Sequence, residues 1–185
     1  MNHEYHFLTH WRIPRASVED VFKIIADVEA LPQWWPSVYL GVRAVDQRTF
    51  ELHTKGWLPY TLRWQMSVDA AEPPHFSRIG AHGDFEGRGI WTLWQEGRDV
   101  HLLFDWKLLA QKPLLRTLSP ALKPAFAANH RWAMRQGERS LRQEVLRRRG
   151  RKAPPPPPPT SWQPWAALAV GFMALAVLSK LTRRK

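Results

Sequence analysis

The sequence predicts an α+β fold in which a curved antiparallel sheet surrounds one long C-terminal helix. Three observations predict this fold. The stretch from Ser119 to Arg149 has the composition and spacing of a single long helix. Most of the chain before it alternates apolar and polar side chains, which is typical of strands with one buried face. Such a face needs a partner, and the terminal helix is the available one.

The chain begins with a strand and two short helices. Residues 5–13 alternate with a period of two, and Pro14 ends the strand because it has no N–H for a sheet ladder. Ser17 is a candidate N-cap for the first helix, since two acidic residues follow it in the first turn. A second short helix is expected over residues 28–35, bounded by prolines.

The central part of the chain is expected to form about six antiparallel strands. The alternating segments are residues 38–45, 48–55, 58–68, 75–82, 83–94 and 100–108. Glycines at alternate positions of the 83–94 segment indicate a bend or a close approach of backbone.

The long helix is expected to begin with Ser119 as N-cap and Pro120 in the first turn. Its inward stripe is interrupted by a polar residue, Asn129, and by a residue without bulk, Gly137. The whole stripe comprises Leu122, Phe126, Asn129, Ala133, Gly137 and Leu141.

Composition excludes several classes of site. The 185 residues include no cysteine, so disulfides and thiolate metal sites are absent. The net charge of +11 belongs to the tail, because residues 1–146 carry only +2 and residues 147–185 hold nine basic residues and no acidic one. These basic residues bracket an apolar segment, which favours anionic lipid over nucleic acid as the partner. We expect no metal site, since the histidines lack ligand spacing.

The composition divides the chain into a domain and a tail. Residues 1–149 form the expected domain, residues 150–161 a basic and proline-rich linker, residues 162–181 a transmembrane helix, and residues 182–185 a basic tail. Six consecutive prolines make the linker a semi-rigid spacer. Residues 162–179 contain no charge and are long enough to cross most of a bilayer. No apolar signal segment opens the chain, so we expect a single-pass C-terminal anchor with a cytoplasmic domain.

Four stretches stand in an informative order along the chain. They are WRIPRASVEDVFKIIADVEALPQWWPSV, GDFEGRGIWTL, HLLFDWKLL and NHRWAMRQGERSL. Together they resemble the SRPBCC (START-like) superfamily of the polyketide cyclase/dehydrase type, over about residues 4–146. The resemblance implies a helix-grip fold that encloses an apolar cavity for lipids, sterols, polyketides or quinones. It implies no single catalytic signature and no cofactor.

Aromatic residues on the apolar strand faces have two interpretations, core packing or a wall around a ligand. Trp34 and Trp35 could form a lid, or cap one end of the core. Asn129 could bond to strand backbone, or donate to a ligand. The predicted ligand-binding residues are Trp11, Trp35, Tyr60, Trp64, Phe85, Trp91, Phe104, Trp106, Phe126, Asn129 and His130.

The sequence therefore predicts membrane-tethered binding or transport of a hydrophobic small molecule, such as a lipid, a quinone or a polyketide-like compound. The alternative is a cyclase/aromatase-type enzyme in which His130 or a cavity carboxylate performs acid–base work. A third possibility is an interaction protein whose own side chains fill the cavity.

Overall fold

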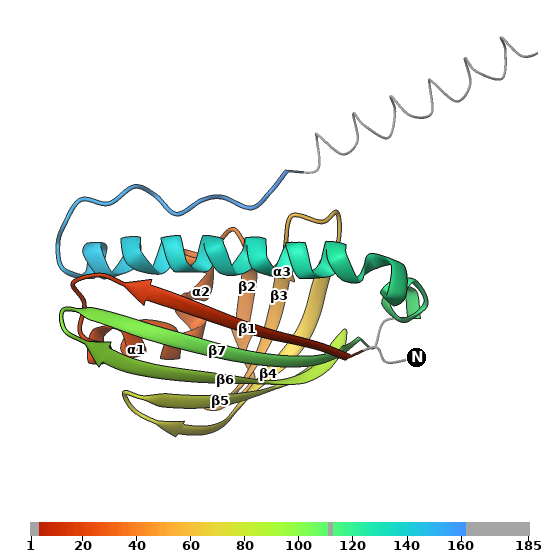
Figure 1. The fold of residues 1–185 in the computed structure, drawn as a ribbon, viewed down its shortest axis with the longest axis horizontal. Coiled ribbons are helices and arrows are strands. Elements are labelled where there is room, and N and C mark those ends of the chain that lie inside the picture. Colours follow the sequence, from red (N-terminus) through yellow and green to blue (C-terminus); the bar gives the residue numbers. More distant parts are fainter. Residues whose placement is uncertain (1–3, 111–112, 162–185) are drawn as a thin grey trace, which may run out of the picture.

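A computed structural model describes residues 4–110 and 113–161, and within the last helix it describes side chains from Lys123 onward. The order of elements is one strand, three short helical segments, six more strands and a long helix. A proline-rich segment follows that helix. The arrangement is drawn in Figure 1.

The seven strands form one antiparallel sheet in the order β1-β7-β6-β5-β4-β3-β2. Consecutive strands from β2 to β7 are neighbours, and β1 closes the far edge by pairing with β7, so that Trp11 lies opposite Leu102. The strands are β1 (Glu4–Ile13), β2 (Tyr39–Ala44), β3 (Thr49–Lys55), β4 (Thr61–Glu72), β5 (Phe76–Gly83), β6 (Phe85–Glu96) and β7 (Asp99–Ala110). The sheet curves, and α3 (Pro113–Arg148) lies across it (Figure 1). This is the expected α+β arrangement of a curved sheet against a long C-terminal helix.

The helices follow the sequence signals with two corrections. Ser17 caps α1 (Val18–Ala26), because its Oγ accepts a hydrogen bond from the N–H of Asp20 at 3.3 Å. The expected second helix is divided into η1 (Val28–Ala30) and α2 (Leu31–Trp34).

The predicted start of the long helix was wrong. Helix α3 begins at Pro113, so Ser119 and Pro120 lie within it. Pro113 occupies its first position, where an N–H would have no helical partner and a proline is tolerated.

Strand β4 begins at Thr61 and not at Leu58 as the alternation predicted. The backbone N–H groups of Trp57 and Leu58 donate to the side chain of Asn129, so these residues belong to a loop held by α3.

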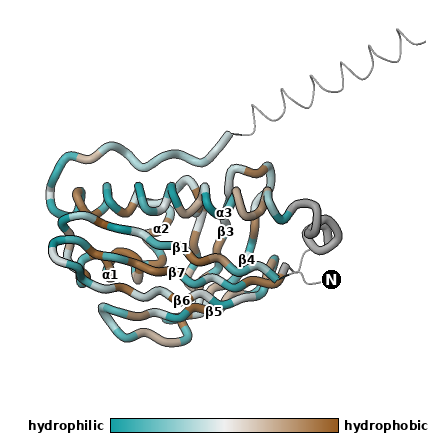
Figure 2. Tube along the Cα trace, viewed as in Figure 1, coloured by the Kyte–Doolittle hydropathy of each residue, from teal (hydrophilic) through white to brown (hydrophobic). Residues whose placement is uncertain are grey.

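The most densely buried part of the molecule lies where α1 and α2 meet the C-terminal half of α3. Its side chains are almost without exposed surface, and they include Ile13, Val21, Ile24, Trp34, Val100, Leu102, Leu141 and Val145. In Figure 2 the turns of α3 alternate between hydrophilic and hydrophobic colours, as expected of a helix with one buried side. This packing anchors one end of the helix on the sheet.

The proline-rich segment after α3 runs back along that helix (Figure 1). Near its start, Arg147 Nη1 donates to the carbonyl of Pro154 at 2.9 Å. At its far end, Thr160 Oγ1 donates to the carbonyl of Gly56 at 2.9 Å, and the ammonium of Lys55 donates to the carbonyl of Thr160. The predicted spacer is thus bonded to the domain at both ends.

Among residues 4–110 and 113–161, no helix is long and apolar enough to cross a membrane. The predicted transmembrane helix over residues 162–181 lies outside the described residues.

Candidate ligand cavity

A cavity of about 460 Å³ lies between the sheet and the middle of α3, where residues 126–134 line it. Side chains of β1, β3, β4, β6 and β7 form its walls, and α1 and α2 contribute residues such as Phe22 and Trp34. Most of the lining side chains are aliphatic or aromatic. Cavities of roughly 300–1,000 Å³ with mostly apolar walls and a few polar groups are typical small-molecule sites.

Aromatic rings from neighbouring strands form one continuous wall. The rings of Trp91 and Phe104 are stacked with centroids 4.2 Å apart, and Phe104 stacks on Trp106 at 5.3 Å. Trp64 and Phe85 continue the wall, with their centroids 5.0 Å apart. Such a surface suits a flat or flexible apolar molecule.

Gly89 explains why the alternating glycines of β6 matter. A Cβ at this position would lie 2.7 Å from Trp106 Cε3 and 2.8 Å from Phe104 Cε2, closer than real Cβ atoms approach. The glycine therefore lets both rings lie against the backbone. The expected close approach is thus observed at the aromatic wall.

All eleven residues predicted to bind a ligand line this one cavity. Many of them are also buried, for example Trp11 at 2% exposure, so packing and lining are combined in the same side chains. Their role in ligand binding stays a prediction.

Sequence reasoning missed several lining residues, among them Phe7, Tyr39 and Lys55. Phe7 could have been found, because it shares the inward face of its strand with Trp11. Lys55 could not, since a lysine at the end of a strand is ordinarily solvated.

The Trp34–Trp35 pair lines the cavity with two buried rings. Trp34 is 1% exposed and Trp35 is 5% exposed, so neither ring lies at an entrance. Trp35 packs where Gly137 has no side chain: a Cβ on Gly137 would lie 2.4 Å from Trp35 Cζ2. Gly137, the residue without bulk in the helix stripe, therefore leaves the space that the buried ring of Trp35 occupies.

Asn129 bonds to backbone through one end of its amide. Its Oδ1 accepts from the N–H of Trp57 at 2.9 Å and from the N–H of Leu58 at 3.2 Å. These two donors fix the orientation of the amide, so Nδ2 is the end directed elsewhere. No group in the described part of the chain accepts a hydrogen bond from that Nδ2. Asn129 thus fixes the β3–β4 loop and retains a donor beside the cavity.

His130, the next residue of α3, is held by a ring contact. Its imidazole stacks on Phe7 with centroids 4.1 Å apart and 16° between the planes. Its Nε2 is buried and has no hydrogen-bond partner among the described residues. Burial, with a smaller contribution from the charge of Arg131, lowers the pKa of His130 from 6.5 to about 4. The ring is therefore neutral at neutral pH.

Polar groups gather at the end of the cavity under the β3–β4 loop. Lys55, only 7% exposed, and Gly56 line it beside Asn129. Tyr60 lies close by, with its ring 6.4 Å from that of Phe126, and burial raises the pKa of Tyr60 to about 12. Within the described residues, no aspartate or glutamate lines the cavity. This end, which we call the polar end (Lys55, Tyr60, Asn129 and His130), is rich in donors and contains no carboxylate.

Two acidic residues near the start of β6 lie outside the cavity. Asp84 accepts from the N–H of Arg63 at 2.8 Å, and Glu86 pairs with His82 at 2.6 Å, so both stabilise the end of the sheet.

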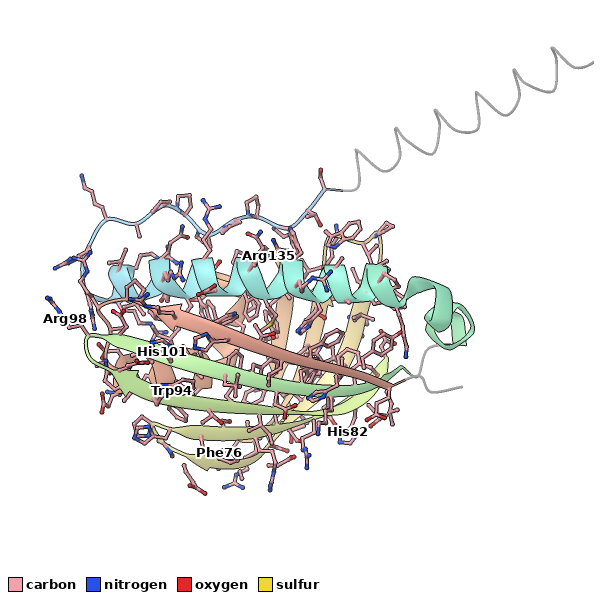
Figure 3. All side chains as sticks on the ribbon, viewed as in Figure 1. Phe76, His82, Trp94, Arg98, His101 and Arg135 are labelled. Atoms are coloured by element: carbon pink, nitrogen blue, oxygen red, sulfur yellow. The ribbon has the colours of Figure 1, made fainter. Side chains whose placement is uncertain are left out.

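The histidines of the outer face pair with their neighbours. His6 pairs with Asp105 and His10 with His101, each at 2.9 Å. Figure 3 shows His101 on β7 and Trp94 on β6, and the centroids of their stacked rings are 5.5 Å apart. No cluster of three potential metal ligands occurs within the residues that the structure describes.

Comparison with known protein families and with curated proteins finds no match. Solved structures do match. The Zhui aromatase/cyclase of a Streptomyces species superposes with a TM-score of 0.67 at 14% identity, over 79% of this chain and 96% of its own. A protein of Thermus thermophilus matches with a TM-score of 0.63 at 18% identity, over 78% of this chain and 99% of its own.

A START superfamily protein of Mycobacterium smegmatis matches with a TM-score of 0.54 at 15% identity, over 79% of this chain and 99% of its own. Identities this low establish the fold and not the activity. The chain therefore has the α+β helix-grip fold of START-like proteins, with a seven-stranded antiparallel sheet against α3.

Proposed function

We propose that this protein binds a hydrophobic small molecule between its sheet and α3, and that its C-terminal segment tethers it to a membrane. The cavity carries the first part of the proposal. Its volume of about 460 Å³ lies within the size range of small-molecule sites, and its walls are largely aromatic. The third possibility, a cavity filled by the protein's own side chains, is disfavoured by that volume.

Membrane tethering is supported by the sequence after the domain. Residues 162–179 carry no charge, Trp162 and Trp165 stand at one end, and basic residues follow the other end. As a helix, a segment of this length would extend about 27 Å, close to the thickness of a bilayer core. A tether would keep the cavity at high effective concentration near lipid, which suits uptake from or delivery to the bilayer.

Binding is favoured over cyclase or aromatase chemistry because the cavity lacks a suitable acid. Fold similarity to an aromatase/cyclase does not transfer the activity. The imidazole of His130, with a pKa of about 4, is almost wholly deprotonated at neutral pH and is a weak base. No carboxylate in the described part of the cavity could assist it.

The binding proposal is tested by identifying what the full-length chain carries when a copolymer excises it from its membrane in nanodiscs, without detergent. Organic extraction and mass spectrometry should find an apolar compound in stoichiometric amount. The matched control is Ala133→Leu, because Ala133 lines the cavity and a leucine there occupies ligand space. The compound should be lost from this variant. Equal amounts in both proteins would contradict binding in the cavity.

The tether is tested separately by alkaline carbonate washing of membranes. The full-length chain should remain in the membrane pellet, whereas a chain that ends at Ser161 should move to the supernatant. A full-length chain in the supernatant would contradict the tether and leave the cavity proposal standing.

A further inference from the structure

The polar end of the cavity is suited to one kind of ligand head group. Asn129 packs against Gly56, the residue that follows Lys55: a Cβ on Gly56 would lie 2.0 Å from Asn129 Oδ1. The Lys55 ammonium lies beside the same loop, since it donates to the carbonyl of Thr160, whose hydroxyl bonds to Gly56. Lys55 and Asn129 therefore both line the part of the cavity next to the β3–β4 loop.

The charges around this end have one sign. Lys55 is a cation and is 7% exposed. His130 is neutral at neutral pH, and the raised pKa of Tyr60 keeps its phenol protonated. Among the described lining residues there is no aspartate or glutamate. A cationic head group would meet repulsion here without a compensating carboxylate, whereas an anionic oxygen group would meet donors.

The rest of the lining is mainly apolar. It includes the aromatic wall, the buried Trp34–Trp35 pair, and Phe22 and Ile25 of α1. An amphipathic ligand would therefore place its apolar chain against these side chains, and its head group under the β3–β4 loop.

We infer that the ligand is an apolar molecule ending in a carboxylate, and that Lys55 and Asn129 Nδ2 bind this carboxylate at the polar end. The inference rests on the proposed function and names its ligand class. Charge-assisted hydrogen bonds to a carboxylate are about twice as strong as neutral ones, so head-group charge should dominate the selectivity.

The test uses the full-length chain in lipid nanodiscs and three probes with the same ten-carbon chain: decanoate, decanamide and decylamine. Calorimetric titration, with empty nanodiscs as the blank for partitioning, gives their affinities. Decanoate should bind at least about tenfold more tightly than decanamide, a difference of roughly 1.4 kcal/mol, and decylamine should bind most weakly.

The decisive variant is Asn129→Asp. Aspartate keeps an oxygen for the N–H groups of Trp57 and Leu58, so the loop stays in place, but it replaces the Nδ2 donor with negative charge. Decanoate should lose about tenfold or more in affinity, and decylamine should gain. Lys55→Gln should abolish the preference for decanoate over decanamide, and Lys55→Arg should retain it; circular dichroism checks that each variant is folded.

The outcomes separate the two proposals. Equal affinity for all three probes, or an unchanged order in Asn129→Asp, would overturn the carboxylate inference while hydrophobic binding stands. Absence of binding by every probe would overturn both.

Discussion

Two segments of α3 differ in how they pack against the sheet. From Gly137 to Val145 the helix is core: Leu141 has no exposed surface, Val145 is 3% exposed, and Gly137 receives the ring of Trp35. From Phe126 to Met134 the inward side chains border the cavity, and they include the polar groups of Asn129 and His130. One helix is thus packed at one end and lines a cavity at the other.

The difference arises from what covers each half. Over the C-terminal half, α1 and α2 fill the space between helix and sheet, and ion pairs such as Arg149 to Asp20 at 2.8 Å hold the elements together. Along residues 126–134 the inward side chains face the cavity, and the β3–β4 loop is bonded directly to Asn129. Three kinds of substitution test this contrast.

The largest effect is expected for Leu141→Ala in the core half. Removing a fully buried leucine typically costs about 2–5 kcal/mol of unfolding free energy. The matched control is Leu146→Ala on the same helix, since Leu146 is 37% exposed and should lose less than about 1 kcal/mol. Urea unfolding of the full-length chain measures both. Similar losses would show that the C-terminal half is not the packed half.

A pH effect of up to about 3 kcal/mol is expected from His130, because its pKa is lowered from 6.5 to about 4. Between these values the unfolded chain binds more protons than the folded chain. Stability from this group is therefore complete above about pH 6.5 and is lost progressively as the pH falls toward 4.

The matched control for this pH effect is His130→Phe, which keeps a ring on Phe7 and cannot titrate. It should unfold with a smaller dependence on pH in this window; some slope will remain, because burial also lowers the pKa of His53. An unchanged slope in His130→Phe would contradict the burial of this imidazole.

A smaller effect is expected at the loop. Asn129→Ala removes the acceptor of two backbone N–H groups that are only partly buried, so a loss of about 1 kcal/mol is expected. Asn129→Asp should be close to neutral, because the carboxylate accepts the same bonds. Hydrogen exchange at Trp57 and Leu58 should quicken in the alanine variant alone. Equal exchange in all three proteins would exclude Asn129 as the anchor of the loop.

The sequence predicted most of the fold because alternation and helical periodicity are local signals. The sheet, the Ser17 cap and the inward stripe of α3 from Phe126 to Leu141 followed from such local signals. The start of β4 at Thr61 could not be predicted from local signals. Trp57 and Leu58 belong to a loop because their N–H groups bond to Asn129, which is distant in the sequence. The predicted start of α3 at Ser119 was also wrong, since the helix begins at Pro113. The prediction failed because prolines at 120 and 124 disfavour a helix locally.

Many of the residues that line the candidate site could be predicted from the sequence, but the existence of a cavity between them could not. The periodicity placed the aromatic side chains on inward faces, and the structure brings the eleven predicted residues together. Whether such faces meet or leave space depends on long-range packing, such as Trp35 occupying the notch at Gly137. The burial of Lys55 could not be predicted either, because it depends on a contact with Thr160, which is distant in the sequence.

The most direct test of the contrast between the two halves is urea unfolding of two leucine variants one helical turn apart, in protein freed of bound ligand. Ala133→Leu adds its side chain to the cavity and should change the unfolding free energy by less than about 1 kcal/mol. Gly137→Leu must displace the buried ring of Trp35 and should cost at least about 1–3 kcal/mol more. Equal losses in the two variants would contradict a helix that is core at one end and cavity wall at the other.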